Sequence, residues 1–342
     1  MNTLLADNTA GDITPQDVRD CVEALYLYAT DIAVGADSNT TWVNCDAATD
    51  GDGTIGSPRN DLKAAVDAAT DGDTVLFIGT HTVDSASDQI NLDTDGVHLR
   101  GIDQRGSIIR LDTATADPFR MRANRIKAEN FTLDGNRDTV ALTVQNMHGV
   151  YVGIATSSVV YTDITVKDLI IKDWHDSGIT INKGSGESTV TRSLFQGNYI
   201  TNCGNIVATE GGSEDADEHM FRSFRLTHST IEDNLIELSA PVIEFGDADD
   251  GWDAAGSYAA SSGDPANCNG MYIGQQSAYC VIRNNTIRNN NRPNFAPGGT
   301  VALIPAGTGS FAMASRRVEI TNNTYDNNDT VDIAIISGLV VD

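Results

Sequence analysis

Short apolar runs separated by polar turns dominate the chain from Trp42 onward. Runs such as Val75-Leu76-Phe77-Ile78 and Ile179-Thr180-Ile181 are rich in β-branched residues, which is typical of strands. Between the runs stand Gly, Asn and Asp, the residues that favour turns. One phrase returns along the chain: an Asn or Asp, one further residue, then an aliphatic, aromatic or Thr residue. It begins at Asn130, Asp168, Asn198, Asn234, Asn285 and Asn323.

The intervals between these phrases, by subtraction, are 38, 30, 36, 51 and 38 residues, an irregular period in the range of solenoid repeats. A short strand cannot bury its apolar face alone. Stacked about 4.8 Å from the same strand of the next coil, it completes a hydrogen-bond ladder and a core. Asn and Asp tolerate the left-handed backbone of a sharp corner, and stacked Asn side chains can bond along the axis. The pattern predicts stacked coils; a β-sandwich is disfavoured because the turns are wide and irregular.

A short helix is predicted over residues 58–70. Its apolar residues, Leu62, Ala65, Val66 and Ala69, recur at helical spacing and form one narrow stripe. Ser57 suits the N-cap, Pro58 the first helical position and Gly72 the left-handed residue after the end. An open solenoid end exposes core and unpaired backbone groups. We therefore expect this helix to lie across that end as a cap.

The first residues form a separate unit in this interpretation. Thr14 and Pro15 can begin a helix whose apolar stripe includes Val18 and Leu25, and a polar linker follows at 35–39. Such a module is too short to bury a core of its own. We expect residues 1–39 to be a helical module that docks on a partner or on copies of itself, and residues 40–342 to be one solenoid domain.

Charge excludes some partners and disfavours others. The 342 residues hold 22 Lys and Arg against 48 Asp and Glu, a formal charge of −26. Phosphate binding needs clustered basic residues, so we expect no nucleic acid. No window approaches the roughly 18 apolar residues of a membrane span. The opening MNTLLADNTAGD has no basic region and no long apolar run, so no secretory signal is expected. Five widely spaced cysteines without CxxC are interpreted as buried free thiols.

Several segments together resemble a known family. The run Asp52-Gly53-Thr54 through Gly72-Asp73-Thr74-Val75 resembles the opening of right-handed parallel β-helix proteins of the pectin-lyase-like superfamily. The segments 96–101 (GVHLRG) and 131–136 (FTLDGN) are similar to coils of these proteins. The resemblance covers roughly residues 42–336. It implies a right-handed single-stranded parallel β-helix, and it is not specific for chemistry.

A second resemblance lies in residues 11–20 (GDITPQDVRD), which resemble a segment near the start of bacteriophage tail and virion proteins. Together with a β-helix and no export signal, it implies a tailspike or related receptor-binding protein. Such proteins are typically homotrimers that bind, and often cleave, bacterial surface polysaccharide. The resemblance therefore implies a virion location, with residues 1–39 contacting other virion proteins.

Three acidic segments are the candidate catalytic region. With the recurring phrase kept in register, the loops after residues 182, 209 and 245 come from consecutive coils, so their carboxylates would lie about 5 or 10 Å apart. These distances span the separations of retaining and inverting glycosidases. Glu244 interrupts the apolar run 242–245 and is the predicted general acid; Glu210, Asp247 or Asp250 would be its partner.

Neighbouring residues complete the predicted site. Trp252 and Tyr258 can stack against sugar rings, and Trp174, His175 and Lys183 are predicted to border the same face. No cofactor is required by this chemistry. Two other interpretations of the acidic loops stay open: plain solvated loops, and a Ca²⁺ site, since that ion takes hard oxygen ligands.

The sequence thus predicts a tailspike-like protein that recognises a surface polysaccharide, with hydrolysis as an attached activity. Three alternatives stay open: a polysaccharide lyase, a stand-alone microbial carbohydrate-active enzyme, and a non-catalytic structural protein of a virion or surface. A lyase needs a basic residue to take a proton from a uronate, and His175 and Lys183 are its candidates.

Overall fold

Four groups of parallel strands build the molecule. The computed structural model describes residues 39–113, 117–137, 139–140, 148–154, 159–174, 177–182, 188–203, 220–237, 271–273, 277–288, 301–303, 318–326 and 333–335. Within them, every strand pairing is parallel, and each strand pairs with the equivalent strand of the next coil. The predicted module at residues 1–39 lies outside the described residues, except for its last residue, and stays a prediction.

The longest sheet is bent at β2 (Thr74–Val83), and we call its two halves limb 1 and limb 2. Limb 1 runs from β1 (Thr40–Asn44) and β2 through β4 (His98–Gly101), β7 (Lys127–Glu129), β11 (Thr165–Lys167), β15 (Leu194–Gln196), β19 (Thr230–Glu232) and β22 (Val281–Arg283) to β25 (Glu319–Thr321). Limb 2 runs from β2 through β5 (Ser107–Leu111), β8 (Thr132–Asp134), β12 (Ile170–Lys172), β16 (Tyr199–Thr201), β20 (Leu235–Glu237) and β23 (Thr286–Arg288) to β26 (Thr324–Asp326).

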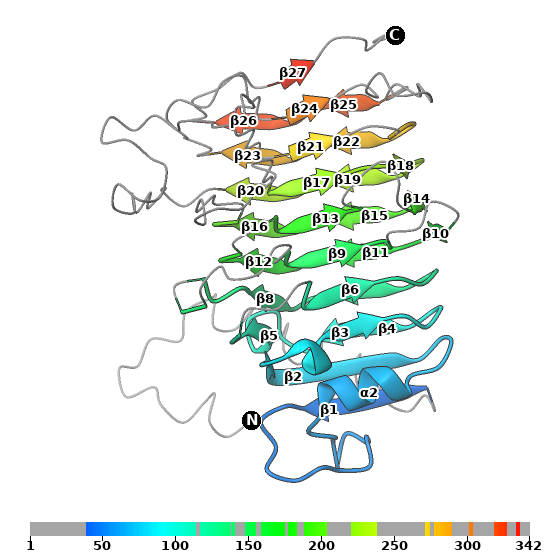
Figure 1. Ribbon diagram of the computed structural model, residues 1–342, viewed down its shortest axis with the longest axis vertical. Coiled ribbons are helices and arrows are strands. Elements are labelled where there is room, and N and C mark those ends of the chain that lie inside the picture. The colour runs from blue at the N-terminus through cyan, green and yellow to red at the C-terminus, as the bar shows by residue number, and fades with distance from the viewer. Residues whose placement is uncertain are drawn as a thin grey trace, which may run out of the picture.

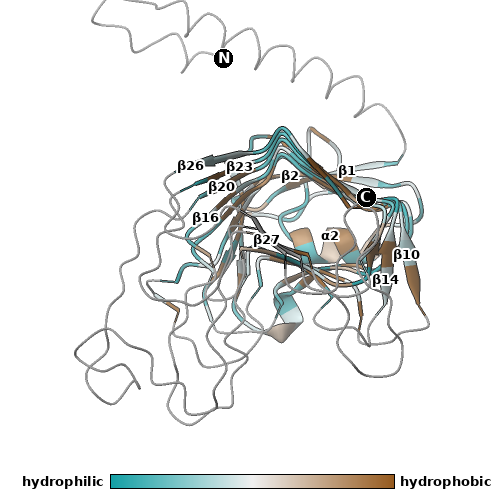
Figure 2. Cartoon of the chain, turned by 90° about the horizontal axis from the view of Figure 1, so that it is seen from above, coloured by the Kyte–Doolittle hydropathy of each residue, from teal (hydrophilic) through white to brown (hydrophobic). Residues whose placement is uncertain are grey.

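The remaining strands form two further sheets. The eight-stranded sheet comprises β3 (Ile90–Leu92), β6 (Phe119–Met121), β9 (Val150–Val152), β13 (Ile179–Ile181), β17 (Phe221–Ser223), β21 (Met271–Ile273), β24 (Val301–Leu303) and β27 (Ile333–Ile335). The three-stranded sheet comprises β10 (Val160–Thr162), β14 (Thr189–Thr191) and β18 (Leu226–Thr227). The coils stack along one axis (Figure 1), and from above the strands outline a tube (Figure 2). The parallel β-helix expected from the sequence is confirmed.

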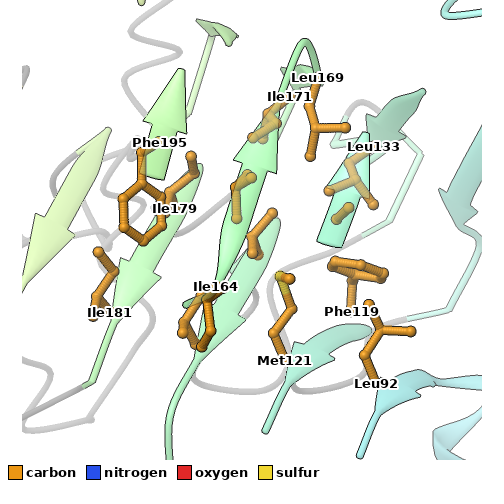
Figure 3. Packing of buried hydrophobic residues seen from close by; sticks show 14 of the residues in the cluster. Leu92, Phe119, Met121, Leu133, Ile164, Leu169, Ile171, Ile179, Ile181 and Phe195 are labelled. Carbon is orange, nitrogen blue, oxygen red and sulfur yellow. The ribbon is translucent and has the colours of Figure 1, made fainter. Parts of the chain in front are cut away.

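The core fills this tube. In limb 1 the middle residue of each short strand points inward, so that Val166, Phe195 and Ile231 follow one another in register and are fully buried. The eight-stranded sheet does the reverse: its first and third residues, such as Ile179 and Ile181, are the buried ones. Figure 3 shows Phe195, Ile179 and Ile181 among the core side chains that pack against one another. Because each coil is too small to bury its own apolar residues, the stack is what stabilises them.

One corner explains the recurring phrase. Between limb 1 and limb 2, one residue of each coil from β7 onward has positive φ: Asn130, Asp168, Gly197, Asp233, Asn284 and Asn322. The residue after it is Phe131, Leu169, Asn198, Asn234, Asn285 or Asn323. The phrase therefore mixed two positions. Asn130 and Asp168 supply the left-handed backbone, which short polar side chains tolerate, whereas Asn198 to Asn323 occupy the next position.

The predicted helix is present and shorter than expected. Helix α2 spans Leu62–Ala68 and lies against β1, β2 and β3 at the N-terminal end of the stack (Figure 1). Its Leu62, Ala65 and Val66 are buried, as the stripe predicts. The N-cap is Asp61, whose carboxylate accepts the Ala64 N–H at 2.9 Å, so the predicted cap Ser57 is wrong. A one-turn helix, η1 (Ala86–Asp88), follows β2.

The predicted free thiols are confirmed for the three cysteines in the described part of the chain. Cys203 and Cys280 are buried and Cys45 is partly buried, and none forms a disulfide. Burial raises the pKa of the Cys203 thiol to about 12 and that of Cys280 to about 11. Thiols held protonated in this way are poor nucleophiles.

Candidate functional site

Most of the residues predicted to act on a sugar lie outside the described residues. They are Glu210, Glu244, Asp247, Asp250, Trp252, Tyr258, His175 and Lys183. Their roles stay predictions. The described strands do show between which strands each of these segments lies. They therefore test the prediction that the three acidic segments occupy equivalent positions of successive coils.

The three acidic segments are not equivalent positions of successive coils. The segment 183–187 follows β13 of the eight-stranded sheet, whereas the segment 204–219 precedes β17, the strand that pairs with β13. The expectation that these two loops align is therefore wrong. The segments 204–219 and 238–270 do correspond, because both connect limb 2 to the eight-stranded sheet, entering it at β17 and β21.

Trp174 is a core residue. Its side chain is only 1% exposed, and its indole Nε1 donates to the Leu133 carbonyl oxygen at 3.3 Å. A ring enclosed in this way has no face for a sugar, so the predicted substrate contact at Trp174 is wrong. The apolar residues of this turn point into the tube because Asp173, just before Trp174, has a left-handed backbone with φ of 60°.

A cluster of polar side chains lies on the outer face of the eight-stranded sheet. The outward position of consecutive strands β6, β9, β13 and β17 holds Arg120, Tyr151, Thr180 and Arg222, which pair in register. Each stands between two neighbours that are buried in the core, for example Phe119 and Met121. Because side chains alternate along a strand, the middle residue must point outward. Four coils thus place four hydrogen-bonding side chains in one column, in which Tyr151 and Thr180 are buried and Arg120 and Arg222 are partly exposed.

His148 lies beside this column, next to Thr180 and Asp117. The Thr180 hydroxyl lies 3.2 Å from its Nδ1, and a carboxylate oxygen of Asp117 lies 3.9 Å from its Nε2. The His148 and Tyr151 rings are tilted, with centroids 6.3 Å apart. His148, Asp117 and Thr180 are each at most 2% exposed. The Thr180 hydrogen bond therefore orients the imidazole through Nδ1, while Nε2 faces Asp117 at a distance too long for a hydrogen bond.

Asp117 links the imidazole to the arginine of the column. Its other carboxylate oxygen accepts from the Arg120 guanidinium at 3.5 Å. A buried carboxylate is costly unless charged or polar partners surround it. The Arg120 side chain keeps 24% exposure while Asp117 lies beneath it. The arrangement brings an acid, an imidazole and a guanidinium close together, and of the three side chains only that of Arg120 is partly exposed.

Arg222 is the second guanidinium of the column. Its terminal carbon lies 5.0 Å from the centroid of the Phe224 ring, a cation–π geometry that holds the planar group. Arg222 is partly exposed. A guanidinium presents several donors in a rigid fork that matches carboxylate, sulfate or phosphate oxygens.

Sequence reasoning missed this cluster, although one signal was available. Glu244 is predicted to point outward because it is a charged residue inside an apolar run. The same argument applies to Arg120 in Phe119-Arg120-Met121 and to Arg222 in Phe221-Arg222-Ser223. Asp117 and His148 had no such signal, because both precede their strands and reach the cluster only through the fold.

The described part of the chain contains neither a metal-binding cluster nor a membrane-spanning helix. No group of three or more His, Cys, Asp or Glu side chains in the described ranges is placed to hold a metal ion. In the same part of the chain, no helix has the length and apolar character needed to cross a membrane. A Ca²⁺ site on the acidic loops stays a prediction, since those loops are not described.

The strand pairing and the outward polar column define a β-helix protein with a candidate ligand face on one sheet. No protein-family model matches the chain, and no curated protein matches it. Solved structures similar to it include a mannuronan C-5 epimerase A-module (AlgE6) of Azotobacter vinelandii, with 15% identity, TM-score 0.40, and coverage of 80% of this chain and 67% of that one.

Two further similar structures have comparable scores. The GH136 lacto-N-biosidase of Eubacterium ramulus has 12% identity and TM-score 0.44, covering 91% of this chain and 64% of that one. The ORF18 protein of Geobacillus virus E2 has 14% identity and TM-score 0.41, covering 87% of this chain and 62% of that one. At these scores the similarities carry no functional conclusion. The fold assignment rests on the strand pairing.

Proposed function

We propose that the protein recognises a polysaccharide along the outer face of the eight-stranded sheet. The observation that carries the proposal is the pair of partly exposed arginines Arg120 and Arg222, at outward positions of β6 and β17 in one register column of this sheet. Strands of successive coils are about 4.8 Å apart, so the two strands lie about 14 Å apart along the axis. A polymer of repeating sugar units is long enough to contact both arginines.

Hydrolysis of the bound polymer remains the proposed activity. The segments with Glu210 and with Glu244, Asp247 and Asp250 both enter the eight-stranded sheet, at β17 and β21. A carboxylate pair supplied from there would meet a polymer bound on that sheet, with one group as general acid and the other activating water. Trp252 and Tyr258 of the second segment are the proposed stacking residues.

Binding to an immobilised panel of neutral and acidic polysaccharides tests the proposal. We expect the whole protein to retain at least one polymer, and Arg222→Ala to weaken retention about tenfold or more, because a charged hydrogen-bond donor is lost. Arg283→Ala is the matched control, since Arg283 is a half-exposed arginine on limb 1, away from the column. Equal weakening by both variants, or no retention of any polymer, would contradict the proposal.

A tailspike role is the finer part of the hypothesis. It predicts a homotrimer attached through residues 1–39 to other virion proteins, and a molar mass of three chains of 36.4 kDa in solution. Release of reducing ends from a bound polymer would support a hydrolase. Release of unsaturated uronate ends would instead support the lyase alternative, and retention without cleavage would support binding alone.

A further inference from the structure

We propose that the N-terminal segment 14–34 docks on the outer face of limb 1 of its own chain, over Trp42 and Leu76. This contact is separate from the proposed polysaccharide recognition and does not depend on it. The apolar stripe predicted for the segment needs a surface to cover, and strands β1 and β2 provide one.

Trp42 and Leu76 face away from the core and are nevertheless buried. Trp42 of β1 pairs in register with Leu76 of β2. Their strand neighbours Val43 and Val75 belong to the hydrophobic core cluster, whereas the two residues themselves do not. Because side chains alternate along a strand, both must point outward. Only 7% of Trp42 and 1% of Leu76 are exposed, so a part of this chain covers them from outside.

The described helix and the segment beside β1 do not form a layer over these two side chains. Helix α2 lies on the core side of the sheet, because its buried Leu62 and Val66 belong to the core cluster. Gly53 and Arg59 hydrogen-bond to the backbone of Trp42 along the outer edge of β1, in the plane of the sheet. The covering layer must therefore come from another segment.

The indole of Trp42 indicates that this layer includes a polar atom. Its Nε1 is buried and has no hydrogen-bond partner among the described residues. A buried donor left without an acceptor is costly, and native proteins rarely contain one. We therefore expect the covering segment to bring an acceptor close to this nitrogen.

The chain that precedes β1 joins the solenoid at this patch. Strand β1 starts at Thr40, two residues before Trp42, and residues 1–38 come before it, outside the described residues. The polar linker 35–39 can span at most about 18 Å. The end of the segment 14–34 must lie within that distance of β1, which puts the patch within its reach.

The border of the patch complements this segment. Arg100 follows Leu76 in the same outward column, and Ile78, two residues after Leu76, extends the apolar surface with 36% exposure. The segment 14–34 has four acidic residues and one basic residue. An amphipathic helix can bury its apolar stripe on the patch and bring acidic residues near Arg100. Its opposite face stays available for the proposed contact with virion proteins.

Hydrogen–deuterium exchange of the whole protein tests the docking. Amides of 14–34 should exchange about tenfold or more slowly than in a free peptide of the same sequence, because a helix of this length is marginal alone. Leu25→Asp on the stripe and Leu76→Ala on the solenoid should both remove most of this protection. Leu27→Asp, on the opposite side of the predicted helix, is the matched control and should keep it.

Docking is contradicted if the wild type shows no protection, if Leu25→Asp or folded Leu76→Ala leaves it intact, or if Leu27→Asp removes it as well. Because Leu25 lies outside the solenoid, the comparison of the two aspartate variants decides the question even if Leu76→Ala fails to fold.

A cross-link identifies which copy of the chain supplies the segment. With p-benzoylphenylalanine in place of Leu25, irradiation should link this position to a peptide that contains Trp42 or Leu76. A link within one chain leaves a species of 36.4 kDa on a denaturing gel, whereas a link between copies doubles the mass. We expect the single-chain species. A doubled mass would show that a second copy covers the patch, and a link to neither peptide would exclude the segment as the cover. Either result would overturn the docking and leave the proposed polysaccharide function standing.

Discussion

The side-chain Nδ2 of Asn234 lies 2.9 Å from the side-chain oxygen of Asn285, which stands at the same corner one coil further along. The same contact joins Asn198 to Asn234 and Asn285 to Asn323. Each of these amides also donates to a carbonyl of limb 1, as Asn234 does to Phe195 at 3.0 Å. The four Asn side chains form a ladder, in which the hydrogen bonds between side chains join one coil to the next along the solenoid axis.

Replacing a central rung should be costly. Asn234→Ala removes the acceptor of the Asn198 backbone N–H and side-chain Nδ2, and Asn198 is buried. Each buried donor left without a partner costs about 1–3 kcal/mol. We expect the free energy of unfolding to fall by about 2–4 kcal/mol, measured by urea denaturation. Thr286→Ala, at a partly exposed outward position of β23, should change it by about 0.5 kcal/mol or less. Similar losses in both variants would contradict the ladder's role.

The ladder also shows which features of the fold could be predicted from the sequence and which could not. The Asn-rich phrase was sufficient to predict stacked coils, because both corner positions favour Asn for different physical reasons. It could not separate the left-handed Asn130 from the ladder residue Asn198, which occupies the next position. Loop lengths between coils vary, so the register of the acidic segments could not be followed through the phrase alone. The burial of Trp174 depends on the backbone of Asp173, which hydropathy does not encode.

A second regularity of the coils concerns charge. In the coils from β7 to β22, the third residue of the limb 1 strand and the residue five positions later on limb 2 have the same charge, and the sign alternates between successive charged coils. The pairs are Glu129 and Asp134, Lys167 and Lys172, Glu232 and Glu237, and Arg283 and Arg288, with the neutral pair Gln196 and Thr201 in the middle. Opposite charges face each other across adjacent strands, and this pairing favours the native register of the coils.

Reversing one charge should therefore destabilise the stack, and reversing its partner should restore it. Lys172 Nζ lies 2.9 Å from an Asp134 oxygen, with both side chains partly buried. Lys172→Glu places like charges opposite each other and should lower the free energy of unfolding by about 1–2 kcal/mol at low salt. Adding Asp134→Lys should recover about half of that loss or more. A double variant no more stable than Lys172→Glu alone would show that the pair does not couple.

Glu129 predicts an acid-sensitive contribution to stability. His98 Nε2 lies 3.0 Å from its carboxylate, and this hydrogen bond holds the pKa of Glu129 below the ordinary value of 4.5. A lowered folded pKa means that the contribution is present above pH 4.5 and is lost as the pH falls through the folded pKa. Glu129→Gln should cost about 1 kcal/mol at neutral pH.

The difference between wild type and Glu129→Gln should shrink as the pH falls below 4.5, measured by urea denaturation across a pH series. His98→Gln serves as the partner control, since it removes the same hydrogen bond from the other side. A difference that stays constant with pH would show that packing, not ionisation, explains the loss.

The hydrolysis proposal depends on Glu244. Glu244→Gln keeps the size of the side chain and removes its proton-donating ability, so we expect an unchanged thermal unfolding midpoint and loss of any release of reducing ends. Glu232→Gln is a matched control, because Glu232 lies on limb 1, bonded to Arg283, whereas the segment of Glu244 enters the eight-stranded sheet at β21. Activity retained by Glu244→Gln would place the catalytic carboxylates elsewhere in the chain.

Helix α2 is predicted to protect the N-terminal end of the stack. Leu62 is fully buried between the helix and the first coils, so Leu62→Ala should lower the free energy of unfolding by about 2–5 kcal/mol. If α2 also acts as a cap, loosening it exposes apolar residues and strand edges that can pair with another molecule. Folded Leu62→Ala should then form larger species in sedimentation velocity, while Asp67→Asn on the exposed face of α2 stays like wild type. If Leu62→Ala is destabilised but sediments like the wild type, the result would support the packing role of Leu62 and contradict the capping role of the helix.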